Sequence, residues 1–199
     1  MKARITSNKD HPIGQSIAKC WNDVTFFSRS SDWNITNEHD VNRFVNETTD
    51  YDWTINFCIG YGFHGVNLFL RIQDFCEKNK ISHNILNIGS YLGFPLLHNP
   101  HGSYDIEKST LKHANRRAAF SYSFHNSYLD SRIINFGYLE GSYLTTELPH
   151  IHLLDLKSVT KNVEFMLENP SIKELSVQYK QPGNHRINNG IGPILPSLF

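Results

Sequence analysis

The feature that most constrains the fold of this chain is the alternation of short β-rich runs with stretches of helical periodicity. Six runs rich in β-branched and aromatic residues predict strands. They are residues 3–7, 24–28, 53–59, 84–89, 132–136 and 174–179. Five stretches between them predict helices, at residues 13–21, 38–47, 66–79, 103–124 and 158–169. This alternation predicts an α/β fold, a doubly wound parallel sheet with helices on both faces.

The length of the chain indicates a single domain, because 199 residues suffice for one sizeable core. We assign residues 1–180 to this domain. Residues 181–199 are expected to form an irregular C-terminal tail, because they are rich in Pro, Gly and Asn. Thr36 and Ser158 are expected to begin two of the helices, and Pro170 to lie just beyond the end of the last one.

Charge and cysteine content narrow the classes of partner. Lys plus Arg equals Asp plus Glu at 19 each, so no overall charge draws the chain to nucleic acid or to an anionic membrane. The three cysteines are odd in number and lack metal-ligand spacing, which indicates reduced thiols. The N-terminus lacks the apolar stretch of a signal peptide, and no run reaches the ~18 apolar residues of a membrane helix. We therefore expect a cytoplasmic protein whose partners include no nucleic acid and no membrane.

Ligands of a doubly wound sheet bind beyond the carboxyl ends of its strands. The functional residues are therefore expected in the loops that follow the predicted strands. These loops come after Ser7, Ser28, Ile59, Gly89 and Phe136.

A tyrosine and a lysine stand four residues apart in the predicted helix 103–124. Tyr104 and Lys108 therefore lie on one face of that helix. An ammonium near a phenol favours the phenolate and lowers the pKa of the phenol from ~10 toward neutrality, which suits proton transfer. For the pair taken alone, the alternative is a solvated helix face.

The residues before this helix connect the pair to a known family. ILNIGSYLG, at residues 85–93, is a buried strand that ends in Ser90 and is followed by a glycine, and Tyr104 and Lys108 come soon after it. This order resembles the short-chain dehydrogenase/reductase family, of which the chain looks like a compact, divergent member. The resemblance implies a Rossmann-like fold in which Ser90 bonds the substrate oxygen and Tyr104 is the general acid/base. It further implies that Lys108 binds the nicotinamide ribose and tunes Tyr104.

The resemblance implies one further catalytic residue, and two of the implied residues have a structural alternative. A fourth family residue, an asparagine that supports a proton relay, is matched by Asn67. For Ser90, the alternative is a strand-end serine that caps its own turn. For Asn67, it is a polar residue at the start of a helix.

The family's first loop reads Thr-Gly-x-x-x-Gly-x-Gly, and its glycines let backbone N–H groups approach a pyrophosphate. Here residues 7–14 read SNKDHPIG, so only the last glycine is retained. The asparagine tolerates a left-handed conformation, whereas the proline donates no N–H. The resemblance implies cofactor contacts at Ser7, Asn8, Ile13 and Gly14. The alternative is a polar strand-to-helix loop.

Further cofactor contacts are implied along the chain. Arg29 follows the second strand, where a basic residue favours the 2′-phosphate of NADP over NAD. DWNIT, at residues 32–36, resembles the family segment that lines the adenine, which implies contacts from Asn34 and Ile35. Cys58 stands where the cofactor passes the third strand, and Tyr138 lies in a segment that resembles the one closing over the nicotinamide. The cofactor implied is NADP, with NAD as the alternative.

These expectations combine into an NADP-dependent oxidoreductase that transfers a hydride between the nicotinamide and a small carbonyl or alcohol substrate. A second hypothesis is a catalytically decayed nucleotide-sensing or protein-interaction module, because two loop glycines and a Pro-Gly pair of the family are absent. A third is a sugar-nucleotide reductase or epimerase, which would use the same Tyr-Lys chemistry.

Two other residue groups bear on partners. Aromatic residues near the end of the Tyr-Lys helix favour a subunit interface, and hence a homo-oligomer. They are Phe120, Tyr122, Phe124 and Tyr128. Among the 11 histidines, the close pairs lack a third ligand nearby in the sequence, so no metal site is expected. The pairs are His98 with His101 and His150 with His152.

Overall fold

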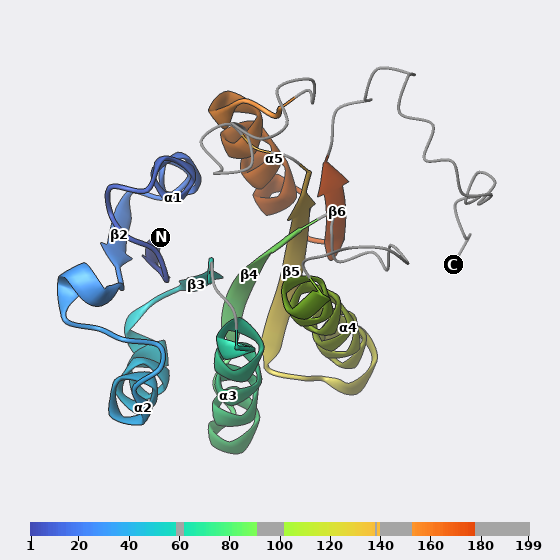
Figure 1. The fold of residues 1–199 in the computed structure, drawn as a ribbon. Helices are drawn as coiled ribbons and strands as arrows, with labels where there is room; N and C mark the ends of the chain where they lie inside the picture. The colour runs from blue at the N-terminus through green and yellow to red at the C-terminus, as the bar shows by residue number, and fades with distance from the viewer. Residues whose placement is uncertain (59–61, 91–101, 138, 140–152, 178–199) are drawn as a thin grey trace.

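Six parallel strands form one sheet in the order β2-β1-β3-β4-β5-β6 (Figure 1). The strands are β1 Lys2–Ile5, β2 Asp23–Phe26, β3 Trp53–Asn56, β4 His83–Ser90, β5 Leu129–Phe136 and β6 Glu174–Val177. The computed structural model describes residues 1–58, 62–90, 102–137, 139 and 153–177, without the side chains of residues 102–105. Because β1 lies between β2 and β3, the direction of winding reverses at β1, which is where such sheets bind ligands.

Helices cover both faces of the sheet (Figure 1). One face carries α1 Pro12–Ala18 and α5 Leu156–Glu168, which pack on each other. The other carries α2 Glu38–Asn46, α3 His64–Asn79 and α4 Gly102–His125. Short 3-10 turns follow β2 and α2, at Arg29–Ser31 and Glu47–Asp50. The predicted α/β, Rossmann-like, doubly wound fold is confirmed, and so is its organisation as one domain.

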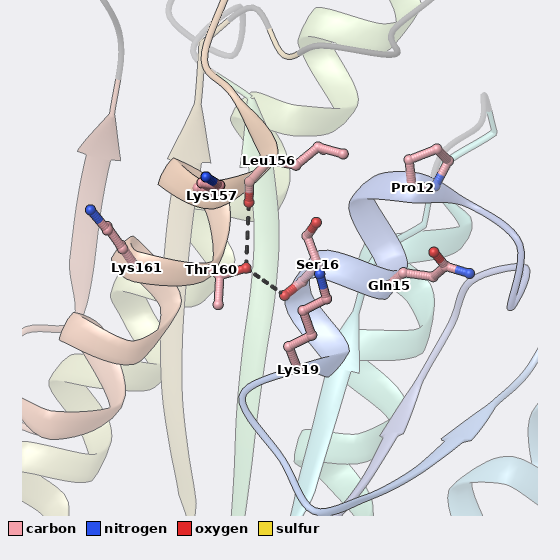
Figure 2. Close-up of a pocket in the computed structure, with 8 residues that line it drawn as sticks. All are labelled: Pro12, Gln15, Ser16, Lys19, Leu156, Lys157, Thr160 and Lys161. Carbon is pink, nitrogen blue, oxygen red and sulfur yellow. Dashed lines mark hydrogen bonds between the residues drawn. The ribbon is translucent and has the colours of Figure 1, made fainter.

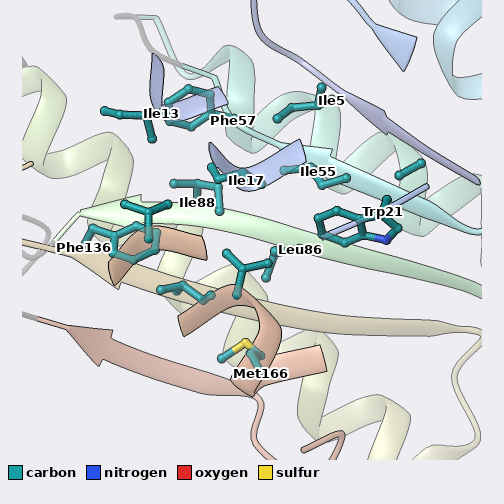
Figure 3. Packing of buried hydrophobic residues seen from close by; sticks show 14 of the residues in the cluster. Ile5, Ile13, Ile17, Trp21, Ile55, Phe57, Leu86, Ile88, Phe136 and Met166 are labelled. Carbon is teal, nitrogen blue, oxygen red and sulfur yellow. The ribbon is translucent and has the colours of Figure 1, made fainter. Parts of the chain in front are cut away.

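The α1/α5 contact is held by polar bonds as well as by apolar packing. The Thr160 hydroxyl donates to the Ser16 carbonyl at 2.9 Å and lies 3.4 Å from the Leu156 carbonyl (Figure 2). Beneath these helices, one apolar core joins them to the sheet (Figure 3). Ile17 and Ile55, both fully buried, belong to this core. A second core, with Phe44 and Phe69 fully buried, fills the opposite face.

The central strands are buried on both faces because helices cover both. All eight residues of β5 and all four of β3 are buried. Polar residues of these strands, such as Arg132 and Asn135, are therefore buried as well. The longest strands, β4 and β5, pair residue by residue from His83 with Leu129 to Ser90 with Phe136. The carboxyl ends of these two strands therefore lie side by side.

Two helix starts differ from the prediction. Thr36 does not begin α2; Asn37 does, and its side chain accepts from the backbone N–H groups of His39 and Asp40. Ser158 does not begin α5 either, because the Asp155 carboxylate accepts from the Ser158 N–H at 2.6 Å and caps the helix one turn earlier. Amide and carboxylate oxygens satisfy N–H groups that a first helical turn leaves without partners.

Candidate active site

A cleft of about 270 Å³ opens at the carboxyl ends of β1, β2 and β3. Six of the ten predicted cofactor residues line this cleft. Cys58 does so from just beyond the end of β3, and the other five follow β1 and β2. The five are Ser7, Asn8, Arg29, Asn34 and Ile35. The cleft is also lined by Thr6, His11, Phe27, Ser28, Trp33, Phe57 and His64. The structure therefore brings together residues from four separate stretches of the sequence.

Gly14, the retained glycine of the first loop, lies so close to the Ser7 side chain that no larger residue fits there. A Cβ atom at Gly14 would lie 2.4 Å from the Ser7 hydroxyl oxygen. That hydroxyl donates to the Asn8 carbonyl at 3.1 Å, so it belongs to the loop beneath α1. Gly14 thus lets α1 pack against the end of β1. The side chain of Ile13 is buried in the α1/α5 core, away from the cleft lining.

Aromatic side chains form one wall of the cleft. The rings of Phe27 and Trp33 meet edge to face, with centroids 6.0 Å apart. The Trp33 indole N–H donates to the Asp40 carbonyl at 3.0 Å, which fixes the ring on α2. Asn34 follows it, with its side-chain oxygen accepting from Thr36 and its N–H bonded to the Asp40 carboxylate at 2.9 Å. This wall offers flat apolar surface with polar groups at its border, which suits a nucleobase.

Arg29 lies at the end of β2, at the first position of the 3-10 turn Arg29–Ser31. Ser28 and Ser31 fix this turn, because the Ser28 N–H donates to the Ser31 hydroxyl at 2.8 Å. The Ser28 and Ser30 hydroxyls lie 2.7 Å apart. The turn therefore presents a guanidinium beside several hydroxyls at the border of the cleft. The chain passes from this turn to α2 without a further strand, as the sequence predicts.

Lys108 is buried in the second turn of α4, facing the sheet. Its ammonium donates to the carbonyl of Cys58 at 3.0 Å and lies 3.4 Å from that of Ile88. Burial lowers the pKa of Lys108, and the nearby Cys58 and Glu107 act in the opposite direction. Tyr104 lies in the first turn of the same helix, and its side chain is outside the described part. Ser90 ends β4, half-buried, next to Phe136 of β5.

Cys58 contacts both the cleft and Lys108. Its side chain lines the cleft, and its carbonyl oxygen accepts a hydrogen bond from the Lys108 ammonium. The thiol lies 3.4 Å from the Thr6 hydroxyl, which itself accepts from the Phe57 N–H at 2.9 Å. Burial raises the pKa of the Cys58 thiol to about 11. Cys58 is therefore a neutral wall residue, and its thiol is not a nucleophile near neutral pH.

Glu107, the neighbour of Lys108, is a buried carboxylate that sequence reasoning missed. It is 2% exposed and accepts from the Phe63 N–H at 3.1 Å, at the start of α3. A carboxylate is favourable there because it faces the positive end of a 16-residue helix. Asn67, the predicted relay residue, lies on the exposed face of α3, and its role stays a prediction. Tyr138, the last predicted cofactor contact, is outside the described residues.

The sequence reasoning also missed several residues that line the cleft, His11, Phe27, Phe57 and His64 among them. Each lies within two residues of a predicted strand end or helix start, so the ends of the predicted elements were the available signal. For His64 this signal does not by itself indicate the cleft, because the packing of α3 beside β3 brings the residue there.

A larger groove of about 380 Å³ lies between α1 and α5, with Lys19, Lys157 and Lys161 at its border (Figure 2). No group of three His, Cys, Asp or Glu side chains that could hold a metal occurs among the described residues, and both predicted histidine pairs lie outside them. None of the helices in the described ranges is both long and apolar enough to span a bilayer.

Comparison with known proteins shows the fold. No family model matches the sequence, and no curated protein matches it. Among solved structures, it is similar to a short-chain dehydrogenase from Burkholderia cenocepacia in complex with NADP, with a TM-score of 0.68, 13% identity and 90% of each chain covered. The fold is that of short-chain dehydrogenases.

Two further structures share this fold. One is a blue fluorescent protein from a metagenomic library in complex with NADPH, with a TM-score of 0.67, 13% identity, and 88% of this chain and 96% of that chain covered. The other is a ketone-specific alcohol dehydrogenase from Comamonas testosteroni, with a TM-score of 0.64, 10% identity, and 94% of this chain and 88% of that chain covered. Identities this low show a common architecture, and the function has to be argued from the site.

Proposed function

We propose that the protein is an NADP-dependent oxidoreductase of the short-chain dehydrogenase type, acting on a small carbonyl or alcohol substrate. The observation that carries the proposal is the bond from the Lys108 ammonium to the Cys58 carbonyl at 3.0 Å. It joins the residue proposed for catalysis to the wall of the cleft proposed for the dinucleotide. Structures of similar fold solved with NADP or NADPH support the choice of cofactor.

In this proposal each end of the dinucleotide meets residues suited to it. The adenine lies against Trp33 and Ile35, and the Arg29 guanidinium pairs with the 2′-phosphate. The nicotinamide end extends past Cys58 toward Lys108. When bound, the cofactor supplies or accepts the hydride.

The protein's own residues then handle the proton and the substrate oxygen. Ser90, at the end of β4, orients the substrate oxygen, and Tyr104 donates a proton to it or removes one. Lys108 favours the phenolate of Tyr104 and hydrogen-bonds the ribose. Because the Lys108 ammonium is held by the Cys58 carbonyl, just after β3, and by the Ile88 carbonyl of β4, its position is fixed before any ligand arrives.

The test is a calorimetric titration of the purified protein with NADPH and, in parallel, with NADH. We expect binding of both with a preference for NADPH, followed by oxidation of NADPH in the presence of some members of a panel of small ketones and aldehydes. Binding without turnover on any panel member would favour the alternative of a nucleotide-sensing module. Absence of binding at millimolar concentration would overturn the proposal.

We also propose that the protein forms a homo-oligomer through the end of α4. Phe120 and Phe124 are 55% and 71% exposed, and their rings lie 4.7 Å apart on the helix surface. Tyr128, predicted for the same surface, is instead half-buried against the core. Light scattering should give a mass that is a multiple of 23.0 kDa, and the variant with Phe120→Glu and Phe124→Glu should be a monomer.

A further inference from the structure

Three backbone donors of the loop between β1 and α1 are occupied, by the loop itself or by β1. The Ser7 N–H donates to the Ile5 carbonyl at 3.0 Å, and the His11 N–H donates to the Asn8 carbonyl at 3.0 Å. The Asp10 N–H is taken by the Asn8 side chain at 3.1 Å. Pro12, the first residue of α1, has no N–H to offer. A pyrophosphate in the cleft would therefore meet fewer free backbone donors in this loop than a glycine-rich loop offers.

Two histidines line the same cleft from different elements. His11 precedes α1, and its ring meets the Phe57 ring edge to face, with centroids 5.3 Å apart. His64 is the first residue of α3. Its Nε2 lies 2.9 Å from the place where a Cβ atom would stand at Gly62, a residue with a φ of 109°. Glycine at position 62 thus makes room for the imidazole of His64 beside the cleft.

The imidazole of His11 has a buried nitrogen without a protein partner. Its Nδ1 atom is inaccessible to solvent and has no hydrogen-bond partner, whereas buried polar atoms are nearly always paired. Such an unpaired nitrogen is unfavourable, and a ligand oxygen would relieve it after a rotation of the ring about its Cβ–Cγ bond.

The charges around the two imidazoles suit an anion. No carboxylate occurs among the described residues that line the cleft, which contribute the Arg29 guanidinium and the neutral Cys58 thiol. Lys9 and Asp10 lie on the exposed outer side of the loop. From α4, the Glu107 carboxylate is bound to the Phe63 N–H, next to His64 in the chain. Burial lowers the pKa of His11, so without an anion its imidazole is mostly neutral near pH 7.

We infer that His11 and His64 bind the phosphate groups of the dinucleotide with their side chains, in place of the backbone donors of a glycine-rich loop. This inference rests on the proposed function, because it concerns the same cleft. An imidazolium N–H donates a charge-assisted hydrogen bond to a phosphate oxygen. Burial favours the neutral imidazole of His11 by lowering its pKa, and a bound phosphate favours the imidazolium, so binding takes up a proton and weakens as the pH rises.

The experiment compares ADP with adenosine as probes, since the two differ only in their phosphates. Calorimetric titrations at several pH values between ~5.5 and ~8 would be run in buffers of different ionisation enthalpy, which reveals proton uptake. The proteins are the wild type, His11→Gln, His64→Gln, the double variant, and His113→Gln as a matched control. His113 lies on the exposed surface of α4, away from the cleft lining.

We expect the wild type and His113→Gln to prefer ADP, with proton uptake on binding. Each cleft variant should lose about tenfold in affinity for ADP, with adenosine binding unchanged. The double variant should lose the part of the pH dependence that comes from the protein, which leaves only that of the terminal phosphate of ADP. Circular dichroism and thermal unfolding would establish that each variant folds. Unchanged ADP affinity in folded variants, or a wild type that does not bind ADP, would overturn the inference.

The same titrations separate the two proposals. If folded cleft variants bind NADPH as tightly as the wild type does, the histidine inference fails and the proposed function stands. If ADP binds with the expected histidine dependence but no carbonyl compound is reduced, the inference stands and the oxidoreductase proposal fails.

Discussion

The two halves of the candidate site are built in opposite ways. Around β1 and β2, the cleft is open and lined by both polar and aromatic side chains, and the His11 Nδ1 has no hydrogen-bond partner among the described residues. Around β4 and α4, the Lys108 ammonium is buried and bonded to the Ile88 carbonyl of β4 and to the Cys58 carbonyl just after β3. An open half with unpaired groups is suited to receive a ligand, whereas a buried and bonded half holds its residues in place without one. Ligand binding should therefore depend on the first half, and chemistry and stability on the second.

The largest effect that tests this division is expected for Tyr104→Phe. Loss of the phenolic proton should lower turnover by about a thousandfold, roughly 4 kcal/mol in the barrier, because the phenyl ring can neither donate nor accept a proton. The affinity for NADPH should stay the same. NADPH oxidation with an active carbonyl compound measures the first quantity, and calorimetry the second. Loss of binding together with turnover would show that the two halves do not act separately.

A smaller effect, on stability, is expected for Gly89→Ala in the buried half. A Cβ atom at Gly89 would lie 2.2 Å from the side-chain oxygen of Asn135 on β5, so the strand or the amide has to shift. We expect a loss of roughly 2 kcal/mol in the free energy of unfolding, measured by denaturant titration. The control is Asn135→Ala in the same background. Because the Asn135 amide has no hydrogen-bond partner, removing it should restore most of that stability.

A polar network links β1, β3 and β4 beneath α2, away from the cleft, and predicts a dependence of stability on pH. Thr54 on β3 bonds both the Arg4 guanidinium of β1 and the His83 ring of β4, each at 2.8 Å. Burial lowers the pKa of His83 to about 3, so this ring is neutral in the folded protein at pH 5, where it is charged in the unfolded chain. Its contribution to stability is complete above ~6.5 and is lost as the pH falls toward the folded value.

The corresponding variant is His83→Gln, which keeps a polar side chain but cannot titrate. Between pH 6 and 4, we expect the wild type to lose about 1.4 kcal/mol per pH unit more than the variant. Denaturant unfolding at several pH values measures this difference. Equal slopes of stability against pH in the wild type and the variant would mean that folding does not lower the pKa of His83.

The smallest effect is expected for Arg29→Gln in the open half. Its guanidinium is exposed at the border of the cleft, so loss of its pairing with a 2′-phosphate should weaken NADPH binding about fivefold, ~1 kcal/mol. NADH binding and thermal stability should not change. Arg117→Gln, on the exposed surface of α4, is the matched control. An equal loss for both cofactors would assign Arg29 to the pyrophosphate instead.

Strand and helix positions were predictable because they depend on local periodicity. The predicted strand 84–89 became β4 His83–Ser90, and the predicted helix 103–124 became α4 Gly102–His125. Helix starts were less predictable, since a cap is decided by which nearby oxygen reaches the free N–H groups. At α5 the Asp155 carboxylate, rather than the Ser158 hydroxyl, caps the helix, because it accepts from the Ser158 N–H.

What the sequence by itself determined is the alternation of elements, the covering of the sheet on both faces, and the expectation of a ligand site at the carboxyl ends of the strands. What only the tertiary structure decided is which side chains meet there. Lys108 and Cys58 are 50 positions apart, and Glu107 and Phe63 are 44 apart, yet each pair is bonded. No local pattern encodes such contacts, because they follow from the order in which β1, β3 and β4 pair and from the packing of α3 against α4.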